Sequence, residues 1–501
     1  MKRSKFSLSH YRMFSGDLGQ LLPCGLTEVL PGDTMQQASS VLVRFAPLVA
    51  PVMHPMHVRI HHFYVPNRLI WDDWENFITG GPDGNDASVY PTITFSGGSG
   101  AAVGSLADYL GVPTGVDGLE VSALPFRAYA FIYNEYFRDQ DLNTELTIDT
   151  TSGADTTTNT TLQNVNWERD YFTVARPWEQ KGDSVTLPLG TTAPVKGIGH
   201  VAGTWDIISG TINESGGDTV TAANTDGERW ASDNSGRSVY LKQLASDTDH
   251  PDVYTDLSDA TAASVIDLRE AFGLQRYKEA RARYGSRYVE YLRYCGVKSS
   301  DARLDRPEYF GGGRQTIQFS EVLQTAEGSG TAVGELKGHG IGAMRSNRYR
   351  RFIEEHGWVV SLISIRPKTI YEDGLQRHWN RRTKEDFFQK ELQHIGQQEI
   401  LNKEIKAGHA TPEGVFGYGD RYDEYRHAWS GIAGDFKGNL NHWHVANSYA
   451  TDPSLNADFI KCVPNASQIF ASASDDVVYF MVNHSIQARR AVSRSASASV
   501  F

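Results

Sequence analysis

The sequence predicts a mainly β protein, built as a single antiparallel β-sandwich with large loop and helix insertions. Strand patterns rich in β-branched and aromatic residues recur at residues 57–65, 357–367 and 477–482, separated by very long connections. A regular alternation of strands and helices is not visible, and neither is a fixed repeat, which argues against a parallel sheet or a solenoid. The 47 glycines suit many tight turns.

In the first third of the chain, the strand at 57–65 ends at the dipeptide Pro66-Asn67. A short helix is expected at 71–78, where Gly80, Gly81 and a proline stop it. A second helix is expected to begin at Pro125 and to continue to Phe137. Its density of aromatic residues predicts burial or contact with a partner.

The middle of the chain has a different composition. Residues 197–260 are rich in Gly, Ser, Thr, Asn and Asp and lack a long period, which predicts a large exposed insertion of loops and short strands. Helical spacing returns at 262–294, where Gly273, Gly285 and Gly296 are expected to divide the helix into pieces.

The last third begins with the strand at 357–367, which a proline ends. Residues 383–386 (TKED) fit a capping box and predict a helix through Leu401, with Gly408 as its stop. The strand at 477–482 follows. Together these elements favour one sandwich whose connections have grown large.

The distribution of charge is asymmetric. The net charge is −12, yet the two ends carry +7 together and no acidic residue, so the rest carries −19. This asymmetry is expected when the termini contact polyphosphate and the body does not, although short basic tails can also be simply solvated. The basic residues at the ends, our candidates for contact with DNA, are Lys2, Arg3, Lys5, Arg12, Arg489, Arg490 and Arg494.

A catalytic motif is not found. The P-loop and the nucleophile elbow are both absent, and the GxGxxA match at 197–202 precedes a β-prone stretch where dinucleotide binding needs a helix. The calcium-loop match that begins at Asp139 lacks the required glycine and glutamate. His442 and His444, expected on one strand face, have no third ligand at a diagnostic spacing. We therefore expect no catalytic residue, no metal and no cofactor.

Three isolated cysteines, Cys24, Cys295 and Cys462, are expected to be reduced thiols. A secretory signal is not recognisable, and no stretch is apolar enough to span a membrane. These observations predict a protein that is made and assembled in a reducing cytoplasm and has no membrane partner.

Several short blocks resemble one known family. They include EVLPGDT at 28–34, FYVPNRLIW at 63–71, LPFRAY at 124–129, NEYFRDQ at 134–140, RPEYFGG at 306–312 and FGYGDRYDEYR at 416–426. In this order they resemble the major capsid proteins of gokushovirus-type microviruses, and the likeness is weakest over 141–260 and the last twenty residues.

The resemblance implies a viral jelly-roll β-sandwich whose copies form a small icosahedral, T=1-like shell around a circular single-stranded DNA genome. It implies residence in the virion, assembly in the bacterial cytoplasm, and three further partners: an internal scaffolding protein, a minor DNA-pilot protein and a host-cell receptor. It also predicts an N-terminal arm at 1–40, the capsid domain at 41–501 with a surface protrusion at 197–260, and a basic tail at 486–501.

Two other classes are compatible with an aromatic- and glycine-rich β-sandwich: a carbohydrate-active enzyme and a glycan-binding adhesin. The enzyme would cleave glycans in a carboxylate-lined cleft. The adhesin would be a monomer or trimer in solution, whereas a capsid protein is expected to form closed shells.

Overall fold

The computed structural model describes residues 3–185, 265–285, 287–325, 333–472 and 474–493, together with short strands between 195 and 255. The chain forms two compact units. One combines Met1–Lys181 with Glu279–Phe501, and the other is Gly182–Lys278. The sandwich and every side chain discussed below belong to the first unit.

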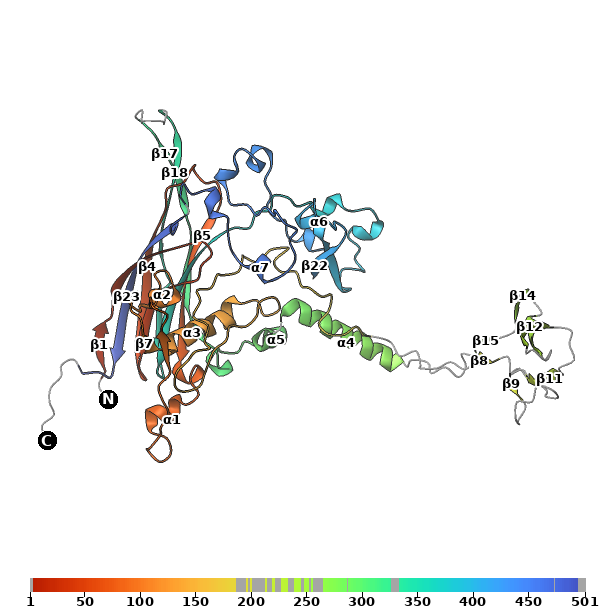
Figure 1. Cartoon of the computed structure of the whole chain (residues 1–501), viewed down its shortest axis with the longest axis horizontal. Helices are drawn as coiled ribbons and strands as arrows, with labels where there is room; N and C mark the ends of the chain where they lie inside the picture. Colours follow the sequence, from red (N-terminus) through yellow and green to blue (C-terminus); the bar gives the residue numbers. More distant parts are fainter. Residues whose placement is uncertain are drawn as a thin grey trace. The chain divides into compact units, whose positions relative to one another are not determined.

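The first sheet follows the order β1-β23-β4-β18-β17, with β2 also paired to β23 and β19 to β4 (Figure 1). All of these pairings are antiparallel, and β23 and β4 stay in register from Val478↔Phe45 to Arg489↔Thr34. The strands are β1 (Ser4–Ser7), β2 (His10–Gly16), β4 (Thr34–Phe45), β17 (Gln318–Leu323), β18 (Leu336–Arg345), β19 (Tyr349–Phe352) and β23 (Val478–Arg490).

The second sheet follows the order β16-β5-β20-β3 and is also antiparallel. Its central pair, β5 and β20, matches the strands expected at 57–65 and 357–367, so both predictions are confirmed. The strands are β3 (Leu22–Val29), β5 (Met56–Pro66), β16 (Glu308–Thr316) and β20 (Gly357–Pro367).

The connectivity defines the fold. The chain passes from β2 in the first sheet to β3 in the second, back to β4, and then to β5 and β16 in the second. It continues through β18 in the first sheet and β20 in the second, and ends with β23 in the first. Eight antiparallel strands that alternate between two sheets in this way form a jelly roll. The predicted β-sandwich of this type is therefore confirmed.

The core lies between the two sheets. Val41, Val43 and Val482 face inward from the first sheet, and Ile60 and Ile363 face inward from the second; all are at most 2% exposed. Alternation of side chains along each strand places them there. Burying one such side chain stabilises the fold by about 1.5–3 kcal/mol.

A helical insertion covers the outer face of the second sheet. Helix α3 (Leu124–Ile132) continues into a π-helical turn (Tyr133–Phe137), which confirms the helix expected from Pro125. Its Phe126 and Tyr129 pack in a second apolar cluster with Phe63 of β5. Burial on both faces explains why β20 reads as a nearly continuous apolar run.

The region between β20 and β23 forms a further insertion, in which Tyr371, Ile405 and Phe416 form a small core with Phe172 from the segment that follows α3. It contains the hairpin β21 (Gln397–Leu401) and β22 (Val415–Asp420) and the short helices α6 (Asn402–Ile405) and α7 (Ala457–Ile460).

One helix prediction in this insertion is wrong. The capping box is present: the side chains of Thr383 and Asp386 each form a hydrogen bond with the backbone N–H of the other residue. It begins only a 3-10 turn at Lys384–Asp386. Residues 397–401 form β21. Gly396 has φ +62°, which breaks a helix, and Ile400 becomes fully buried in the hairpin. Tertiary burial therefore overrides the local helical spacing.

The remaining helices are close to the predictions. The helix expected at 71–78 is α1 (Trp74–Thr79). The helical stretch at 262–294 forms α4 (Val265–Tyr284) and α5 (Tyr288–Tyr294), divided near Gly285 as expected but uninterrupted at Gly273. The other short elements are β6 (Thr92–Phe95), α2 (Leu106–Leu110) and β7 (Leu119–Ser122).

Two predicted segment boundaries differ from the strands. The segment 1–40, expected as an arm, contains β1, β2, β3 and half of β4, so most of it belongs to the sandwich. The basic tail expected from residue 486 begins inside β23, which continues to Arg490. Pairing with neighbouring strands provides hydrogen-bond partners for the backbone N–H and C=O groups of both segments. In a free arm or tail, these groups would bond to water instead.

The second unit contains the whole of the insertion predicted at 197–260. Its described strands form small antiparallel sheets. They are β8 (Val195–Lys196), β9 (Gly199–His200), β10 (Ile212–Asn213), β11 (Thr219–Val220), β12 (Gly227–Ser232), β13 (Ser238–Leu244), β14 (Asp247–Pro251) and β15 (Tyr254–Thr255).

Candidate nucleic-acid interface

The two ends of the chain meet in one ladder of the first sheet. Strand β1 pairs antiparallel with the end of β23, so Lys5 lies opposite Arg489 and Ser4 lies opposite Arg490. Figure 1 shows β1 and β23 side by side at the edge of this sheet. The sequence predicted that both basic ends contact the same partner, and the structure brings their described parts together.

Lys5 and Arg489 line a small pocket of about 150 Å³ together with Arg350 of β19. Thr34, Gln36 and Gln487 complete its walls. All three basic side chains are exposed, and no ion pair involves them among the described residues. Three cations held close together without an acidic partner form a site for a polyanion.

Arg3 and Arg490 lie close in sequence to Lys5 and Arg489, but both are engaged in structural contacts. The Arg3 guanidinium donates to the Gly32 carbonyl oxygen at 2.7 Å and lies over the Phe352 ring. Arg490 forms an ion pair with the fully buried Asp33 at 3.0 Å. Burial raises the pKa of Asp33, and Arg490 opposes that rise. Arg490 therefore fixes the end of β23 against the β3–β4 turn.

Arg12 lies elsewhere. It is opposite Val482 in the β2–β23 ladder, half-buried, and on the side away from the exposed Tyr11 and Met13. Because Val482 is fully buried, the side chain of Arg12 lies on the side of β2 that faces the sandwich interior. The remaining two candidates, Lys2 and Arg494, lie outside the described residues.

The outer face of the first sheet is basic over most of its area. Strands β1, β2, β4, β18, β19 and β23 contain no Asp or Glu, whereas the edge strand β17 carries Glu321, which lies opposite Gly338 and on the same side of the strand as Phe319, facing away from the outer surface. We name as the basic face their exposed, outward-pointing Lys and Arg side chains that form no ion pair among the described residues, together with the apolar and aromatic side chains between them; Lys337 of β18 is excluded because it pairs with Glu335 at 2.9 Å. Its members are Lys5, Arg44, Arg345, Arg350 and Arg489, with Tyr11, Met13, Leu42, Tyr479 and Met481.

The strand pairing of β2, β23 and β4 determines which side chains of the basic face are neighbours. Met13, Met481 and Leu42 lie side by side across β2, β23 and β4, and Tyr479 lies beside Arg44 in the next row. Tyr11 and Met13 are 68% and 80% exposed. Exposed rings between cations are the usual platform for stacking the bases of a single strand.

Arg44, Arg345 and Arg350 are not among the predicted contacts, because the asymmetry of charge along the sequence points only to the chain ends. A local signal was available: residues 345–351 read RSNRYRR, a run of basic residues without an acid. What the run could not indicate is that β19 pairs with β4 and so reaches the neighbourhood of Lys5 and Arg489.

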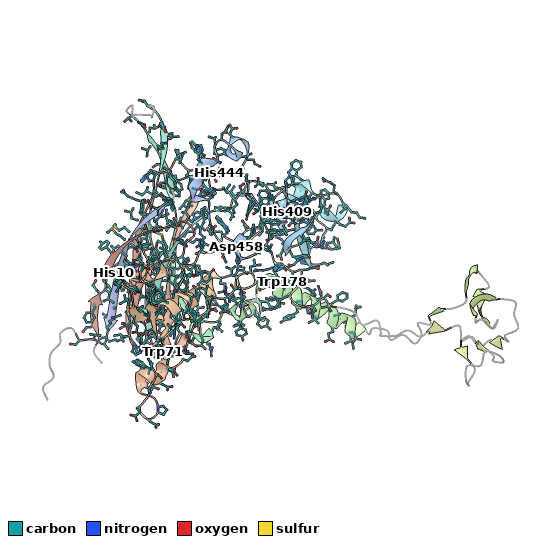
Figure 2. The ribbon with its side chains drawn as sticks, viewed as in Figure 1. His10, Trp71, Trp178, His409, His444 and Asp458 are labelled. Carbon is teal, nitrogen blue, oxygen red and sulfur yellow. The ribbon has the colours of Figure 1, made fainter. Side chains whose placement is uncertain are left out.

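The described histidines do not assemble into a metal site. Figure 2 shows His10, His409 and His444 in three separate places on the first unit. His442 and His444 were expected on a strand, but residues 441–443 form a 3-10 turn, and His444 Nε2 bonds the Phe436 carbonyl oxygen. In the part of the chain that the structure describes, no three His, Cys, Asp or Glu side chains gather as metal ligands.

The cysteines are free thiols, with Cys24 and Cys462 buried and Cys295 exposed. Burial raises the pKa of Cys24 to about 12. Among the described helices, none has both the length and the apolar character needed to cross a bilayer.

The jelly-roll topology, with its basic sheet face and large insertions, is the architecture of viral capsid proteins, although lectins and cupins share the jelly roll. Comparison with known proteins gives the family. The model for "Capsid protein (F protein)" matches residues 1–496. The chain therefore belongs to the phage F capsid protein family.

Three relatives that are similar over nearly the whole length are named capsid protein VP1. The protein of Bdellovibrio phage phiMH2K is 37% identical, and the alignment covers 92% of this chain and 88% of the relative. The protein of Chlamydia phage 1 is 32% identical, with 92% and 89% covered, and that of Spiroplasma virus 4 is 30% identical, with 92% and 87% covered. The predicted role as a major capsid protein of the gokushovirus type is confirmed.

Capsid protein F of Escherichia phage G4 is similar over a shorter stretch, at 33% identity over 27% of this chain and 30% of the relative. The family and these relatives are structural proteins of capsids and not enzymes. The alternatives of a carbohydrate-active enzyme and an adhesin gain no support from them.

Proposed function

We propose that this capsid protein forms a small icosahedral, T=1-like shell around a circular single-stranded DNA genome, with the basic face of its first sheet turned toward the DNA. The observation that carries the proposal is an exposed sheet face without acidic residues on a chain whose net charge is −12. An acidic protein would require such a segregated surface to meet a polyanion.

The contacts fit a single strand without sequence preference. Lys5, Arg350 and Arg489 would neutralise phosphates, while Tyr11 and Tyr479 would stack bases. Arg3 and Arg12 would contribute long-range charge, and Lys2 and Arg494 would extend the basic region beyond the described residues. Arg490 would act through Asp33, holding β23 in place.

The other partners follow from the family resemblance and the organisation of the chain. The protein would assemble with copies of itself in the bacterial cytoplasm, aided by an internal scaffolding protein, and would enclose a minor DNA-pilot protein. Residues 197–260, which lie inside a compact unit of their own, would form the surface protrusion that meets the host receptor. The exposed loops of the first unit offer the several distinct patches that a closed shell requires.

The proposal is tested by photo-crosslinking DNA to protein in intact particles and mapping the crosslinked peptides. We expect crosslinks in β2 and β23, at Tyr11 and Tyr479. The doubly substituted variant Lys5→Glu, Arg489→Glu should still form shells, seen by electron microscopy, but should package little DNA.

The matched control is Arg303→Glu, at an exposed arginine outside the basic face. It should package normally. Particles in which β23 faces the outer surface, or full packaging by the double variant, would overturn the orientation that we propose.

A further inference from the structure

A second basic site lies on the opposite side of the sandwich. A cavity of about 620 Å³ opens between the outer face of the second sheet and the insertion that follows α3. Its floor is formed by β5, which contributes Arg59, His61 and Phe63, and by Arg366 of β20. Nothing in the proposed function uses this cavity.

Five arginines line the cavity, against two carboxylates. Both carboxylates are already paired: Glu168 with Arg59 at 2.6 Å, and Asp139 with Arg176, outside the cavity, at 3.1 Å. The other four cavity arginines are Arg138, Arg169, Arg287 and Arg366. The cavity therefore holds an excess of positive charge.

Three of these four arginines, Arg169, Arg287 and Arg366, form no ion pair among the described residues, although the charges of Glu135 and Glu290 partly oppose the lowering of the Arg287 pKa by burial. Arg366 donates to the Asn166 carbonyl oxygen at 2.8 Å, and Arg287 donates to two main-chain carbonyls. Arg138 reaches only the exposed Glu145, at 3.6 Å. Arg169 is exposed and has no hydrogen bond or ion pair in the part of the chain that the structure describes.

Several buried polar atoms in this cavity also lack a hydrogen-bond partner among the described residues. They are Nε of Arg59, Arg138 and Arg366 and Oδ1 of Asn166. Burial lowers the pKa of the Arg366 and Arg287 guanidinium groups, so charge is held there against a desolvation cost. An anion with several acceptor oxygens would compensate both the charge and the open donors.

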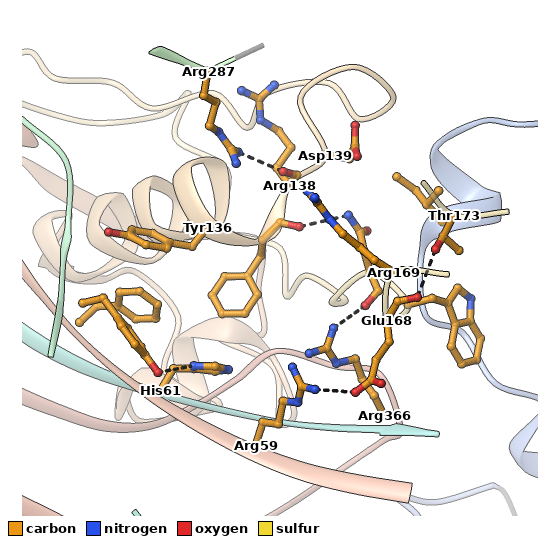
Figure 3. Close-up of a pocket in the computed structure, with 16 residues that line it drawn as sticks. Arg59, His61, Tyr136, Arg138, Asp139, Glu168, Arg169, Thr173, Arg287 and Arg366 are labelled. Carbon is orange, nitrogen blue, oxygen red and sulfur yellow. Dashed lines mark hydrogen bonds and ion pairs between the residues drawn. The ribbon is translucent and has the colours of Figure 1, made fainter. Parts of the chain in front are cut away.

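The opposite wall is aromatic. Figure 3 shows His61 and Tyr136 on one side of the cavity, with Arg169 and Arg366 on the other. Phe63 lies 4.8 Å from Tyr136 and 5.3 Å from Tyr309, centroid to centroid. Tyr309 is 40% exposed, and burial lowers the pKa of His61 to about 4, so His61 is neutral at neutral pH. This wall offers ring surface without adding charge.

We propose that this cavity binds a nucleotide, with the phosphate held by Arg138, Arg169 and Arg366 and the base against Tyr309 and its neighbouring rings. The volume is in the range for one small ligand. Arginine and aromatic walls facing each other match a phosphate joined to a planar base better than they match an acidic peptide, which has no need of the rings. This inference goes beyond the proposed function.

The direct test is a titration of purified subunits with dTMP. The experiment uses the Lys5→Glu, Arg489→Glu background, so that binding at the basic face does not contribute. We expect dTMP to bind, while thymidine and inorganic phosphate bind at least tenfold more weakly, because each engages only one wall. Arg169→Gln should weaken dTMP about tenfold, and Arg303→Gln should have no effect.

A second variant separates the two walls. Tyr309→Leu should weaken dTMP several-fold and leave the weak affinity for inorganic phosphate unchanged. Because Tyr309 and Arg169 are both exposed, these variants should fold, which circular dichroism would verify.

The source of the nucleotide is decided by comparing dTMP with an eight-residue oligothymidylate that lacks a terminal phosphate. Equal or tighter binding of the oligonucleotide would assign the cavity to a nucleotide within a strand. Binding of dTMP alone would assign it to a free nucleotide. Either result supports the proposal.

Three outcomes would overturn it: dTMP affinity unaffected by Arg169→Gln and Tyr309→Leu, inorganic phosphate binding as tightly as dTMP, or a polyglutamate peptide binding more tightly than dTMP. The last would assign the cavity to an acidic segment of a neighbouring copy. Shell formation by the Arg169→Gln variant is read separately by electron microscopy, so failure of this inference is distinguishable from failure of the proposed function.

Discussion

The two sheets of the jelly roll differ most on their outer faces. In β23 of the first sheet, buried and exposed side chains alternate almost without exception. In β20 of the second sheet, nearly every side chain is buried, because α3 and its neighbours cover the outer face. Strand geometry is the same in both cases, so the difference comes from what packs on the outside.

The same contrast appears in the charges. The basic face carries cations that remain exposed and unpaired among the described residues. On the covered side, Arg127 of α3 is fully buried and bonds Asp155 at 2.8 Å, the Ile70 carbonyl oxygen at 3.1 Å and the Thr151 carbonyl oxygen at 3.0 Å. The cations of the basic face are therefore available to a partner, whereas buried Arg127 stabilises the helical insertion on the second sheet.

The largest effect on stability is expected from a substitution in the helical insertion that packs on the second sheet. Arg127→Met should lower the free energy of unfolding by about 3–5 kcal/mol, because it leaves buried Asp155 without its cation. Urea denaturation of purified subunits measures this loss. Arg350→Met on the bare face is the matched control and should change stability by less than about 0.5 kcal/mol. Equal losses in the two variants would erase the distinction between the faces.

The inner faces of the two sheets share a buried polar network, which predicts a response to acid. His484 Nδ1 lies 2.7 Å from Ser39 Oγ, and His62 Nδ1 lies 2.8 Å from Ser361 Oγ. Burial lowers the pKa of His484 to about 4 and that of His62 to about 3, below the unfolded value of 6.5. The unfolded chain thus binds more protons below pH 6.5.

Stability should therefore be complete above pH 6.5 and fall as the pH decreases toward 4, by about 3 kcal/mol for His484 alone. Urea denaturation across this pH range measures the slope. His484→Gln should flatten the slope, whereas His394→Gln, at an exposed position, should not. An unchanged slope in the first variant would assign acid sensitivity to other groups.

A smaller effect concerns the rings of the basic face. Tyr479→Ala should weaken binding of oligothymidylate by about 1–3 kcal/mol, because one base loses its stacking surface. Fluorescence anisotropy with purified subunits measures the affinity. Phe387→Ala removes a ring of similar exposure outside the basic face and should have no effect. If both variants bind alike, the rings of the basic face do not stack on DNA.

The smallest expected effect is that of a single cation. Arg489→Gln should reduce the slope of log affinity for single-stranded DNA against log salt concentration by about 0.7, the value for one phosphate contact. The same anisotropy assay at several salt concentrations gives the slope. Arg490→Gln should instead lower stability, because it removes the partner of Asp33. A change of salt slope in Arg490→Gln alone would reverse these two roles.

Local patterns predicted three strands of the sandwich, at 57–65, 357–367 and 477–482, and all three are present as β5, β20 and β23, but most of the other strands were not predicted. The run at 357–367 coincides with β20, since β-branched residues in a continuous apolar stretch have few alternatives to a buried strand. Residues 383–401 carried an equally good helical pattern, and there the prediction failed. Only burial of Ile400 in the β21–β22 hairpin selects the strand.

The candidate sites were predictable to different degrees. Charge counting identified Lys5 and Arg489, because both lie in basic ends of an acidic chain. It could not distinguish Arg489 from Arg490, which point to opposite sides of β23 and so meet solvent and Asp33 respectively. Arg350 was missed because its place beside them depends on the pairing of β19 with β4.

By itself, the sequence determined the central strands at 57–65 and 357–367, the family and the separation of positive ends from an acidic body, because these depend on local composition and order. The tertiary structure alone decided which cations remain free and which are buried in pairs. It also created the arginine cavity, whose residues Arg59, Arg138, Arg169, Arg287 and Arg366 are far apart in the chain. Side chains from distant strands share one space only after the two sheets and their insertions have packed.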